Sequence, residues 1–594
     1  MCGICGLFSL RGGMENPERP IGAMVAALAH RGPDASGVHV DDRAALGSTR
    51  LAIIDLVGGD PPIYSEDRSV CLVYNGEVYD HLAIRSRLER LGHVFASATD
   101  SEAVVHAYEQ DGIGSVAALN GMFAFAIWDT RRGELHLARD RFGQKPLYYH
   151  WDGTTLVFAS EIKALLASGR VPVALDPDAM VEALTFQNIV SMRSIVRNVS
   201  MVPPGSTLKV DGHGLSITRY FDPMPKPDPA IDAREAAKLV EKEFTHAVER
   251  HLMSDVDVAS YLSGGLDTGS IAAIASATLP RLSTFCIGFD VSGAEGLEAG
   301  FDELDDARVL AETLGTHHHD LRLDASDMEM VLPRMMRHLE EPRMNFSYPN
   351  YLAAGLTSRW VKVVLSGAGG DELFGGYPWR YAHGAGDDFP NSYFSYWNRL
   401  LTPDELRDAL LPDVLEQVDL ERPRAVFDEV MQESEGLPNL DRILYYESRT
   451  YLHGLLVLED KLSMAHSLES RVPFLDHELV DLALAIPAAQ KVFGPRSKEL
   501  FRQAVADILP SAVVSRRKTG FTPPQGAWFR GPQAAYVRRV LTERADSRRI
   551  FRPRFLERVL KEHESGARER HHLIWTLLCL EWWHRIFIDR EHAK

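Results

Sequence analysis

Several features are missing from this chain of 594 residues, and each absence excludes a class of protein. No stretch approaches about eighteen consecutive apolar residues, so neither a transmembrane helix nor a membrane partner is expected. Residues 1–11 contain no basic segment followed by an apolar run, which argues against a secretory signal. The 5 cysteines are spread over the whole chain, a pattern typical of a reducing cytoplasm rather than of a disulfide framework.

Basic residues are also in short supply: 64 Lys and Arg stand against 83 Asp and Glu, which gives a formal net charge of −19. A nucleic-acid or anionic-membrane binder neutralises phosphates with clustered Lys and Arg, so neither kind of partner is expected. Hydrophobic residues at 45% and charged residues at 25% are ordinary values for folded proteins. The length predicts about two to four domains, enough for a large enzyme.

The clearest change in composition is the proline-rich segment 221–229, which predicts an extended linker because proline fixes φ and cannot donate to a strand ladder. Before it, short apolar runs between turn residues predict a mostly β part. After it, strands alternate with helices, which predicts a parallel α/β sheet. The predicted strands are 70–74, 123–128, 156–158, 256–262 and 284–288, and the predicted helices are 233–253, 270–277 and 442–464.

The first candidate for chemistry is Cys2, which becomes the N-terminal residue once the initiator Met1 is removed, as a small second residue favours. An N-terminal cysteine carries its own base, because a free α-amine has a pKa of about 7.7–8.0. Two other interpretations stay open: Cys2 is an ordinary residue, or it forms a redox or metal pair with Cys5. The metal interpretation is weak because no second cysteine pair completes a four-cysteine site.

Further blocks in the first part of the chain favour the nucleophile. Together with Cys2 they resemble the class II glutamine amidotransferases, whose N-terminal-nucleophile domain begins with Cys-Gly-Ile. Each block alone is modestly specific, but together they follow the family's order. The blocks are His30-Arg-Gly-Pro-Asp34, Arg50-Leu-Ala-Ile-Ile-Asp55, Tyr74-Asn-Gly-Glu77, Asp100-Ser-Glu102 and Ala138-Arg-Asp-Arg-Phe-Gly-Gln-Lys-Pro-Leu-Tyr-Tyr149.

The resemblance implies how this site works. The Cys2 sulfur attacks the side-chain amide of glutamine, while the Asn75 side chain and the Gly76 N–H stabilise the oxyanion. Arg50 grips the substrate carboxylate, and acidic side chains hold its ammonium group. Without the resemblance, Arg50 is explained as a surface strand residue and Asp100 as a helix N-cap. The implied catalytic residues are Cys2, Asn75 and Gly76, and the implied glutamine-binding residues are Arg50, Leu51, Ala52, Ile53, Ile54, Asn75, Gly76, Glu77 and Asp100.

A second group of motifs follows the linker. Ser263-Gly-Gly-Leu-Asp-Thr-Gly-Ser270 comes between a predicted strand and a predicted helix, where backbone N–H groups and a helix N-terminus can hold phosphate. It lacks the Gly-Lys-Ser/Thr ending of a Walker loop and resembles the pyrophosphate loop of ATP pyrophosphatases. With the segments 363–377 and 461–477, Lys498 and Arg517-Lys-Thr-Gly-Phe521, the chain resembles the glutamine-hydrolysing asparagine synthetase family over nearly its whole length.

This second resemblance implies a fold and a set of ligands. The expected fold is an α+β N-terminal-nucleophile αββα sandwich at 2–215, a linker at 216–232, and an α/β parallel-sheet ATP-pyrophosphatase domain with helical additions at 233–594. Glutamine, ATP, Mg²⁺ and a carboxylic-acid acceptor are the expected ligands, and a homodimer is expected from the family alone. Without the resemblance, Asp371 is explained as an acid at a helix N-terminus and Lys498 as a solvated helix residue. The implied ATP-binding residues are Leu262, Ser263, Gly264, Gly265, Asp267, Ser270, Ile287, Ser366, Gly367 and Lys498, and the implied metal ligands are Asp267 and Asp371.

The sequence departs from the family pattern in both parts. Gly59-Asp-Pro-Pro62 replaces the usual Gly-Xaa-Gln-Pro, Thr268-Gly269 replaces a Ser-Ser pair, and Arg343-Met-Asn345 stands where many relatives have Phe-Ala-Asp. Ala368 stands where the family has Glu or Asp, and a methyl group can neither transfer protons nor bind an ammonium group. Aspartate or another biosynthetic acid is therefore the expected acceptor, with Glu372 or a water replacing the lost acid if aspartate is kept. The alternatives are a β-lactam synthetase-like cyclase and a non-catalytic paralogue.

Overall fold

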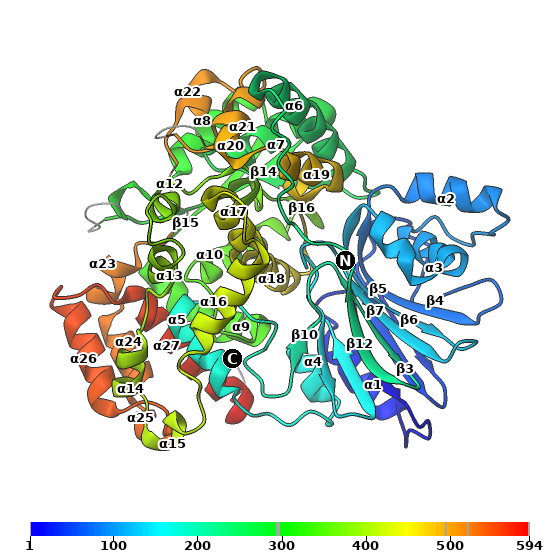
Figure 1. Ribbon diagram of the computed structural model, residues 1–594, viewed down its shortest axis with the longest axis horizontal. Coiled ribbons are helices and arrows are strands. Elements are labelled where there is room, and N and C mark those ends of the chain that lie inside the picture. The colour runs from blue at the N-terminus through cyan, green and yellow to red at the C-terminus, as the bar shows by residue number, and fades with distance from the viewer. Residues whose placement is uncertain (1, 293–297, 493–495, 519–521, 592–594) are drawn as a thin grey trace.

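The computed structural model describes residues 2–292, 298–492, 496–518 and 522–591. Figure 1 shows an N-terminal domain of stacked strands, in blue and cyan, beside a larger C-terminal domain that is rich in helices. Within the described residues, no helix combines the length and the apolar composition needed to cross the hydrocarbon core of a membrane.

Two antiparallel sheets of six strands each face one another in the N-terminal domain. Ile4, Phe8 and Leu46 of the first sheet meet Val73 and Leu137 of the second in a buried apolar layer. The first sheet contains, in spatial order, β10 (Ser200–Met201), β8 (Tyr148–Trp151), β9 (Thr155–Ala159), β1 (Cys2–Ser9), β3 (Ala44–Arg50) and β2 (Ala35–Val40). The second contains β12 (Gly214–Arg219), β11 (Ser206–Asp211), β7 (Glu134–Arg139), β6 (Gly121–Asp129), β5 (Val70–Val78) and β4 (Ile63–Tyr64).

Helices cover the outer faces of both sheets. Helices α1 (Glu18–Ala27) and α4 (Ile162–Ala167) pack on the first sheet, and α3 (Asp100–Asp111), with α2 (His81–Arg90) beside it, packs on the second. The order helix, sheet, sheet, helix confirms the predicted αββα sandwich. Strand β12 belongs to this sandwich and runs past residue 215, to Arg219.

A five-stranded sheet forms the centre of the C-terminal domain, and every neighbouring pair in it is parallel, as predicted. The strand order reverses direction along the chain between β13 and β16, so the loops that follow these two strands diverge at the same edge. A crevice at such a switch point is the usual place for a ligand in an open α/β sheet. In spatial order the strands are β15 (His317–Leu323), β14 (Ser283–Phe289), β13 (Val258–Tyr261), β16 (Val363–Leu365) and β17 (Glu469–Arg471).

The helices of this domain differ in detail from the sequence predictions. Helix α6 spans Ala233–His251, close to the prediction, but α7 (Leu266–Thr278) begins four residues earlier than the predicted start at 270. The helix predicted at 442–464 is two helices, α17 (Asn439–Arg449) and α18 (Tyr451–Met464). They meet at Thr450, whose backbone torsions φ −121° and ψ −64° are not helical.

Buried polar contacts and the linker join the two domains. The fully buried Arg31 donates from Nε to the Cys2 carbonyl at 3.0 Å and from Nη2 to Asp460 of α18 at 2.8 Å. Lys145 lies 3.2 Å from the other oxygen of Asp460. Because buried charges are costly unless they are paired, this triad fixes how the domains meet. The linker 221–229 has no helix or strand, and the Lys226 N–H donates to the Leu484 carbonyl of the C-terminal domain.

Candidate active sites

The first site forms around Cys2, which opens β1 and pairs with Arg50 at the end of β3. The Cys2 N–H donates a 3.1 Å hydrogen bond to Oδ1 of Asn75, which lies on β5 in the facing sheet. Asn75 is fully buried, and its Nδ2 group has no hydrogen-bond partner among the described residues. An unpartnered donor beside a thiol is suited to an oxyanion, because a buried donor without an acceptor is costly until the oxyanion forms.

The surroundings of the Cys2 thiol determine whether it needs a base before it can attack. Burial raises the pKa of the Cys2 thiol, and the nearby Arg50 guanidinium offsets this only in part. The thiol is therefore protonated at neutral pH, and attack requires a base such as an N-terminal α-amine. Gly76 follows Asn75, and a Cβ atom there would lie 2.3 Å from the backbone oxygen of Met122 on β6. The neighbouring strand thus requires glycine at position 76.

Arg50 is buried, so it is not a surface strand arginine. Its Nη2 group donates to the carbonyl of Asp55 at 2.6 Å, and its Nη1 group lies 3.2 Å from Oδ1 of Asp60. Asp60 belongs to the loop 59–62 that departs from the family pattern. Arg50 lines a small cavity beside Cys2. Its guanidinium therefore already has an exposed carboxylate, that of Asp60, beside it.

Asp100 is the first residue of α3, but Thr99 is the N-cap, so the helix N-cap interpretation of Asp100 does not hold. Its Oδ2 atom instead accepts hydrogen bonds from the Tyr74 hydroxyl at 2.8 Å and the Val78 N–H at 3.0 Å. Ala52 does not line the cavity, and its N–H donates to Asp34 at 2.8 Å. The predicted residues that line the cavity are Cys2, Arg50, Leu51, Ile53, Ile54, Gly76, Glu77 and Asp100.

Glu77 also reaches across the domain boundary. Its Oε2 atom lies 3.0 Å from Nη2 of Arg471 on β17, and Arg471 bonds through Nε to Glu469 at 2.6 Å. The backbone oxygen of the same arginine accepts the Ser366 N–H at 2.8 Å, in the loop after β16. Arg471 therefore touches both sites. The sequence analysis missed it, although it lies within the segment 461–477 that carries the family resemblance.

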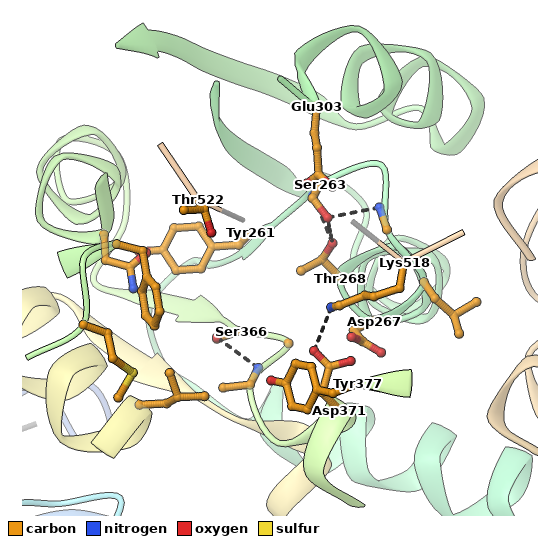
Figure 2. Close-up of a pocket in the computed structure, with 18 of the residues that line it drawn as sticks. Tyr261, Ser263, Asp267, Thr268, Glu303, Ser366, Asp371, Tyr377, Lys518 and Thr522 are labelled. Atoms are coloured by element: carbon orange, nitrogen blue, oxygen red, sulfur yellow. Dashed lines mark hydrogen bonds and ion pairs between the residues drawn. The ribbon is translucent and has the colours of Figure 1, made fainter. Parts of the chain in front are cut away.

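The second site lies at the carboxyl ends of β13 and β16, as the switch point predicts. The Ser263 N–H donates to Oγ1 of Thr268 at 2.9 Å, the two hydroxyls lie 3.0 Å apart, and the Gly265 N–H donates to Oγ of Ser263 at 3.0 Å (Figure 2). Thr268, one of the departures, thus supplies the hydroxyl that shapes the loop. At Gly269 a Cβ atom would lie 3.0 Å from Leu310, so a small residue fits there.

Two carboxylates and two lysines meet beside this loop. Lys498 Nζ lies 2.6 Å from oxygens of both Asp267 and Asp371, and Lys518 Nζ lies 2.7 Å from Asp371 (Figure 2). Lys498 is buried, so it is not a solvated helix residue. Burial alone would raise the pKa of Asp371, but the two lysines hold it well below its usual range. Both carboxylates converge on the positive charge of the Lys498 ammonium group. This arrangement fits Mg²⁺, which takes one or two carboxylates together with phosphate oxygens.

A cavity of about 490 Å³ joins these groups, a volume typical of small-molecule sites. Two predicted ATP-binding residues lie outside its lining: the Gly264 carbonyl accepts from Arg516 Nη1 at 2.8 Å, and the Ser270 hydroxyl donates to the Asp267 carbonyl at 3.0 Å. Residues 519–521 of the motif at 517–521 lie outside the described residues. The predicted residues that line the cavity are Leu262, Ser263, Gly265, Asp267, Ile287, Ser366, Gly367, Asp371 and Lys498.

The other departures are divided between the lining of this cavity and the buried residues around it. Ala368 lines the cavity, whereas Glu372 does not: it is buried with its carboxylate 2.7 Å from the Tyr377 hydroxyl, so Glu372 does not replace the lost acid. Arg399 also lines the cavity, near Tyr396 and Trp397, and no carboxylate among the described residues pairs with it. Arg343 is a structural residue, buried and paired with Glu341 at 2.8 Å.

The carboxylate of Glu459 was not among the predicted residues of this cavity. Glu459 of α18 lines the cavity, and the Ser470 hydroxyl donates to it at 2.5 Å. It stands two residues before Lys461 of a family motif, which was the available signal. The aromatic residues Trp379, Tyr396 and Tyr451 also line the cavity, and no sequence pattern brings them together, because they come from separate segments.

Together the two sites define a class of enzyme, in which a cysteine amidotransferase site and a phosphate-loop site share one chain. Comparison with family models makes this specific: one described as "Asparagine synthase" matches residues 239–585, and one described as "Glutamine amidotransferase domain" matches residues 1–221. The chain belongs to the asparagine synthase family, as its motifs predicted, and is a ligase of that type.

Relatives match over the whole chain. Asparagine synthetase [glutamine-hydrolyzing] 1 of Bacillus subtilis is 30% identical, with 100% of this chain and 98% of that protein covered. A putative asparagine synthetase [glutamine-hydrolyzing] of Mycobacterium tuberculosis is 32% identical, with the same coverage. Among solved structures, glutamine phosphoribosylpyrophosphate amidotransferase from B. subtilis covers 54% of this chain and 65% of its own at 17% identity and a TM-score of 0.28, which is too low to support an argument.

Proposed function

We propose that the enzyme transfers the amide nitrogen of glutamine to a carboxylic acid that it activates with ATP. The observation that carries this proposal is the presence, in one chain, of a thiol beside an unpartnered amide donor and a phosphate loop beside two converging carboxylates. A non-catalytic paralogue would have no reason to keep both sets of groups in place.

In the first half of the reaction, the Cys2 sulfur attacks the side-chain amide carbon of glutamine. The α-amine of Cys2 takes the thiol proton, and the leaving nitrogen departs as ammonia with a proton returned to it. Asn75 Nδ2 and the Gly76 N–H hold the oxyanion, and water then hydrolyses the γ-glutamyl thioester to glutamate. Arg50 binds the substrate carboxylate, and Asp100 binds its ammonium group.

In the second half, an oxygen of the acceptor carboxylate attacks the α-phosphorus of ATP, and pyrophosphate leaves. Ammonia then attacks the acyl carbon of the resulting acyl-adenylate, and AMP leaves as the amide forms. The loop from Ser263 and the Lys498 ammonium hold the phosphates. Asp267 and Asp371 would hold Mg²⁺, which offsets phosphate charge when bound.

The residues that line the cavity support an acceptor other than aspartate. Ala368 removes the acid that would face an α-ammonium group, and Glu372 does not take its place. Arg399 offers a guanidinium that no described carboxylate occupies, and the aromatic side chains around it offer apolar contact. We therefore infer a larger acid that has a second anionic group and no ammonium group at the position that faces residue 368.

A panel of acids tests this assignment. Pyrophosphate release by the full chain with glutamine, ATP and Mg²⁺ is measured for aspartate, glutamate, dicarboxylic acids and aromatic acids. We expect the best acid to exceed aspartate in kcat/KM by at least about tenfold, the equivalent of about 1.4 kcal/mol. The Cys2→Ala variant is the matched control, which should lose turnover with glutamine and keep turnover with ammonium salts.

Each result has a clear meaning. Robust turnover with aspartate alone would overturn the larger acceptor while leaving the amidation reaction intact. Pyrophosphate release that needs neither glutamine nor ammonia would instead indicate an intramolecular cyclase of the β-lactam synthetase type. Unchanged use of glutamine by Cys2→Ala would refute the nucleophile.

A further inference from the structure

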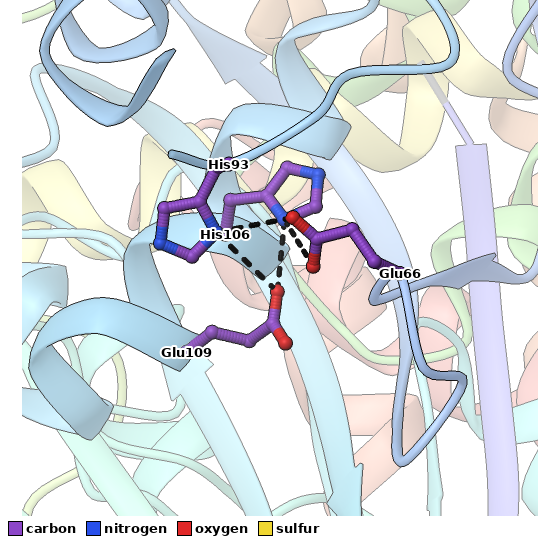
Figure 3. Close-up of side chains that lie close together, drawn as sticks. All are labelled: Glu66, His93, His106 and Glu109. Carbon is purple, nitrogen blue, oxygen red and sulfur yellow. Dashed lines mark hydrogen bonds and ion pairs between the residues drawn. The ribbon is translucent and has the colours of Figure 1, made fainter. Parts of the chain in front are cut away.

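Four metal-ligating side chains meet on the outer side of the N-terminal domain, apart from both active sites. They are Glu66 in the turn between β4 and β5, His93 after α2, and His106 and Glu109 on α3 (Figure 3). One ligand atom from each lies within 4.8 Å of every other. We propose that these four side chains form a binding site for a divalent transition metal of the zinc class.

The distances match a four-coordinate ion. His106 Nδ1 lies 2.8 Å from Glu109 and 3.5 Å from Glu66, while His93 Nδ1 lies 3.3 Å from Glu66 and 3.8 Å from Glu109. Ligands about 2.0–2.2 Å from a tetrahedral zinc ion are separated by about 3.4 Å. Small shifts of these side chains therefore suffice to place an ion at their centre.

The chemistry of the set favours zinc over magnesium or calcium. Imidazole nitrogen is a ligand for zinc, copper and nickel, whereas Mg²⁺ and Ca²⁺ take oxygen ligands. Two carboxylates balance the charge of one divalent cation. Four protein ligands leave no open position, so the site is structural rather than catalytic.

The outer nitrogen of His93 provides a second, independent observation. It lies within hydrogen-bond distance of Oε1 of Gln110, at 3.3 Å, whereas the buried His106 Nε2 makes no hydrogen bond among the described residues and has Oε1 of Glu102 3.5 Å away. Metal-bound histidines usually donate their other N–H to such an oxygen, which fixes the tautomer and turns the free lone pair inward. Glu102 is itself held by the N–H groups of Ala96 and Ser97, at 2.6 and 2.7 Å.

The position of the site suggests its role. His93 and His106 bracket the segment that leads into Asp100 and the wall of the glutamine cavity. A metal that joins this segment to α3 and to the β4–β5 turn would hold the three together. The buried His106 contributes the innermost ligand, and the exposed Glu66 the outermost.

Metal binding by the full chain tests the proposal. After dialysis against a chelator, the protein is titrated with Zn²⁺ in excess Mg²⁺, which keeps the Asp267 and Asp371 carboxylates occupied, and separately with Co²⁺. We expect one tight equivalent of zinc and the intense visible absorption of four-coordinate Co²⁺ without a thiolate charge-transfer band. His93→Gln and Glu66→Gln should abolish that equivalent, and Gln110→Ala should weaken it by about tenfold or more.

The controls keep the result decisive. His39→Gln is the matched variant, because His39 is a partly buried histidine of the same domain that, among the described residues, pairs with a single carboxylate, Asp41 at 3.2 Å. It should keep the zinc equivalent. The proposal is overturned if the wild-type chain binds no zinc, if His93→Gln binds it as well as wild type, or if the Co²⁺ spectrum shows six-coordination or a thiolate ligand.

Discussion

At the residue scale, the contact between Arg50 and Asp60 offers a test of the proposal that Arg50 binds the carboxylate of glutamine. Asp60 lies 3.2 Å from the Arg50 guanidinium, and its side chain is 74% exposed. Removing its charge should free Arg50 for substrate, so Asp60→Asn is expected to lower the KM for glutamine. An exposed ion pair is worth about 0.2–1 kcal/mol, so the decrease should be about 1.5- to 5-fold, with kcat unchanged.

Steady-state glutamine hydrolysis measures this effect, with Asp67→Asn as the control because Asp67 is an exposed aspartate of the same domain outside the cavity lining. An increase in KM with Asp60→Asn would show instead that Asp60 orients Arg50 for binding.

Cavity residues that stand in short motifs were the easiest to predict from the sequence, and their long-range partners were the hardest. Cys2, Asn75 and Asp267 stand in short motifs whose chemistry is local to a strand end or a loop. Arg471 and Glu459 make contacts with segments far away in the chain. No local sequence pattern predicts such contacts. The pair of nearby cysteines, Cys2 and Cys5, was ambiguous until the structure showed Cys5 buried in the core and both thiols free.

At the element scale, the turn from β13 into α7 shows what periodicity can and cannot predict. The strand was predicted from its apolar run, but α7 begins at Leu266, four residues before the predicted start, and includes Thr268, Gly269 and Ser270. Thr268 is therefore inside the helix, with its hydroxyl turned back to accept the Ser263 N–H. The α/β class of the C-terminal domain was predictable from its alternating strands and helices, whereas the αββα sandwich was implied only by the family resemblance. The hydrogen bond from Ser263 to Thr268 has no signature in the apolar pattern.

That hydrogen bond can be tested directly. Thr268→Ala removes the acceptor for Ser263 and the contact between the two hydroxyls, each worth about 1 kcal/mol net. We expect kcat/KM for ATP to fall about 5- to 30-fold in pyrophosphate release, while Thr268→Ser, which keeps the hydroxyl, stays close to wild type. Glutamine hydrolysis in the absence of ATP is the internal control and should not change. Equal activity of the Ala and Ser variants would contradict a role for the hydroxyl.

At the scale of the whole molecule, the two sites must act in step, since ammonia released without an activated acceptor is wasted. One covalent and hydrogen-bonded path joins them: Glu77, which lines the cavity beside Cys2, contacts Arg471, and the Arg471 carbonyl accepts the Ser366 N–H in the loop after β16. We expect Glu77→Ala to loosen this coordination, so that the ratio of glutamate formed to amide formed rises at least about twofold at saturating glutamine. Glu77→Gln keeps an acceptor for Arg471 and should raise the ratio less.

The control for this prediction is Asp481→Asn, which removes an exposed ion pair across the same boundary, with Arg141 at 2.8 Å, and should leave the ratio unchanged. A lower melting temperature of Glu77→Ala with an unchanged ratio would show that the contact only stabilises the domain interface, because breaking a buried pair destabilises a fold whether or not it carries a signal.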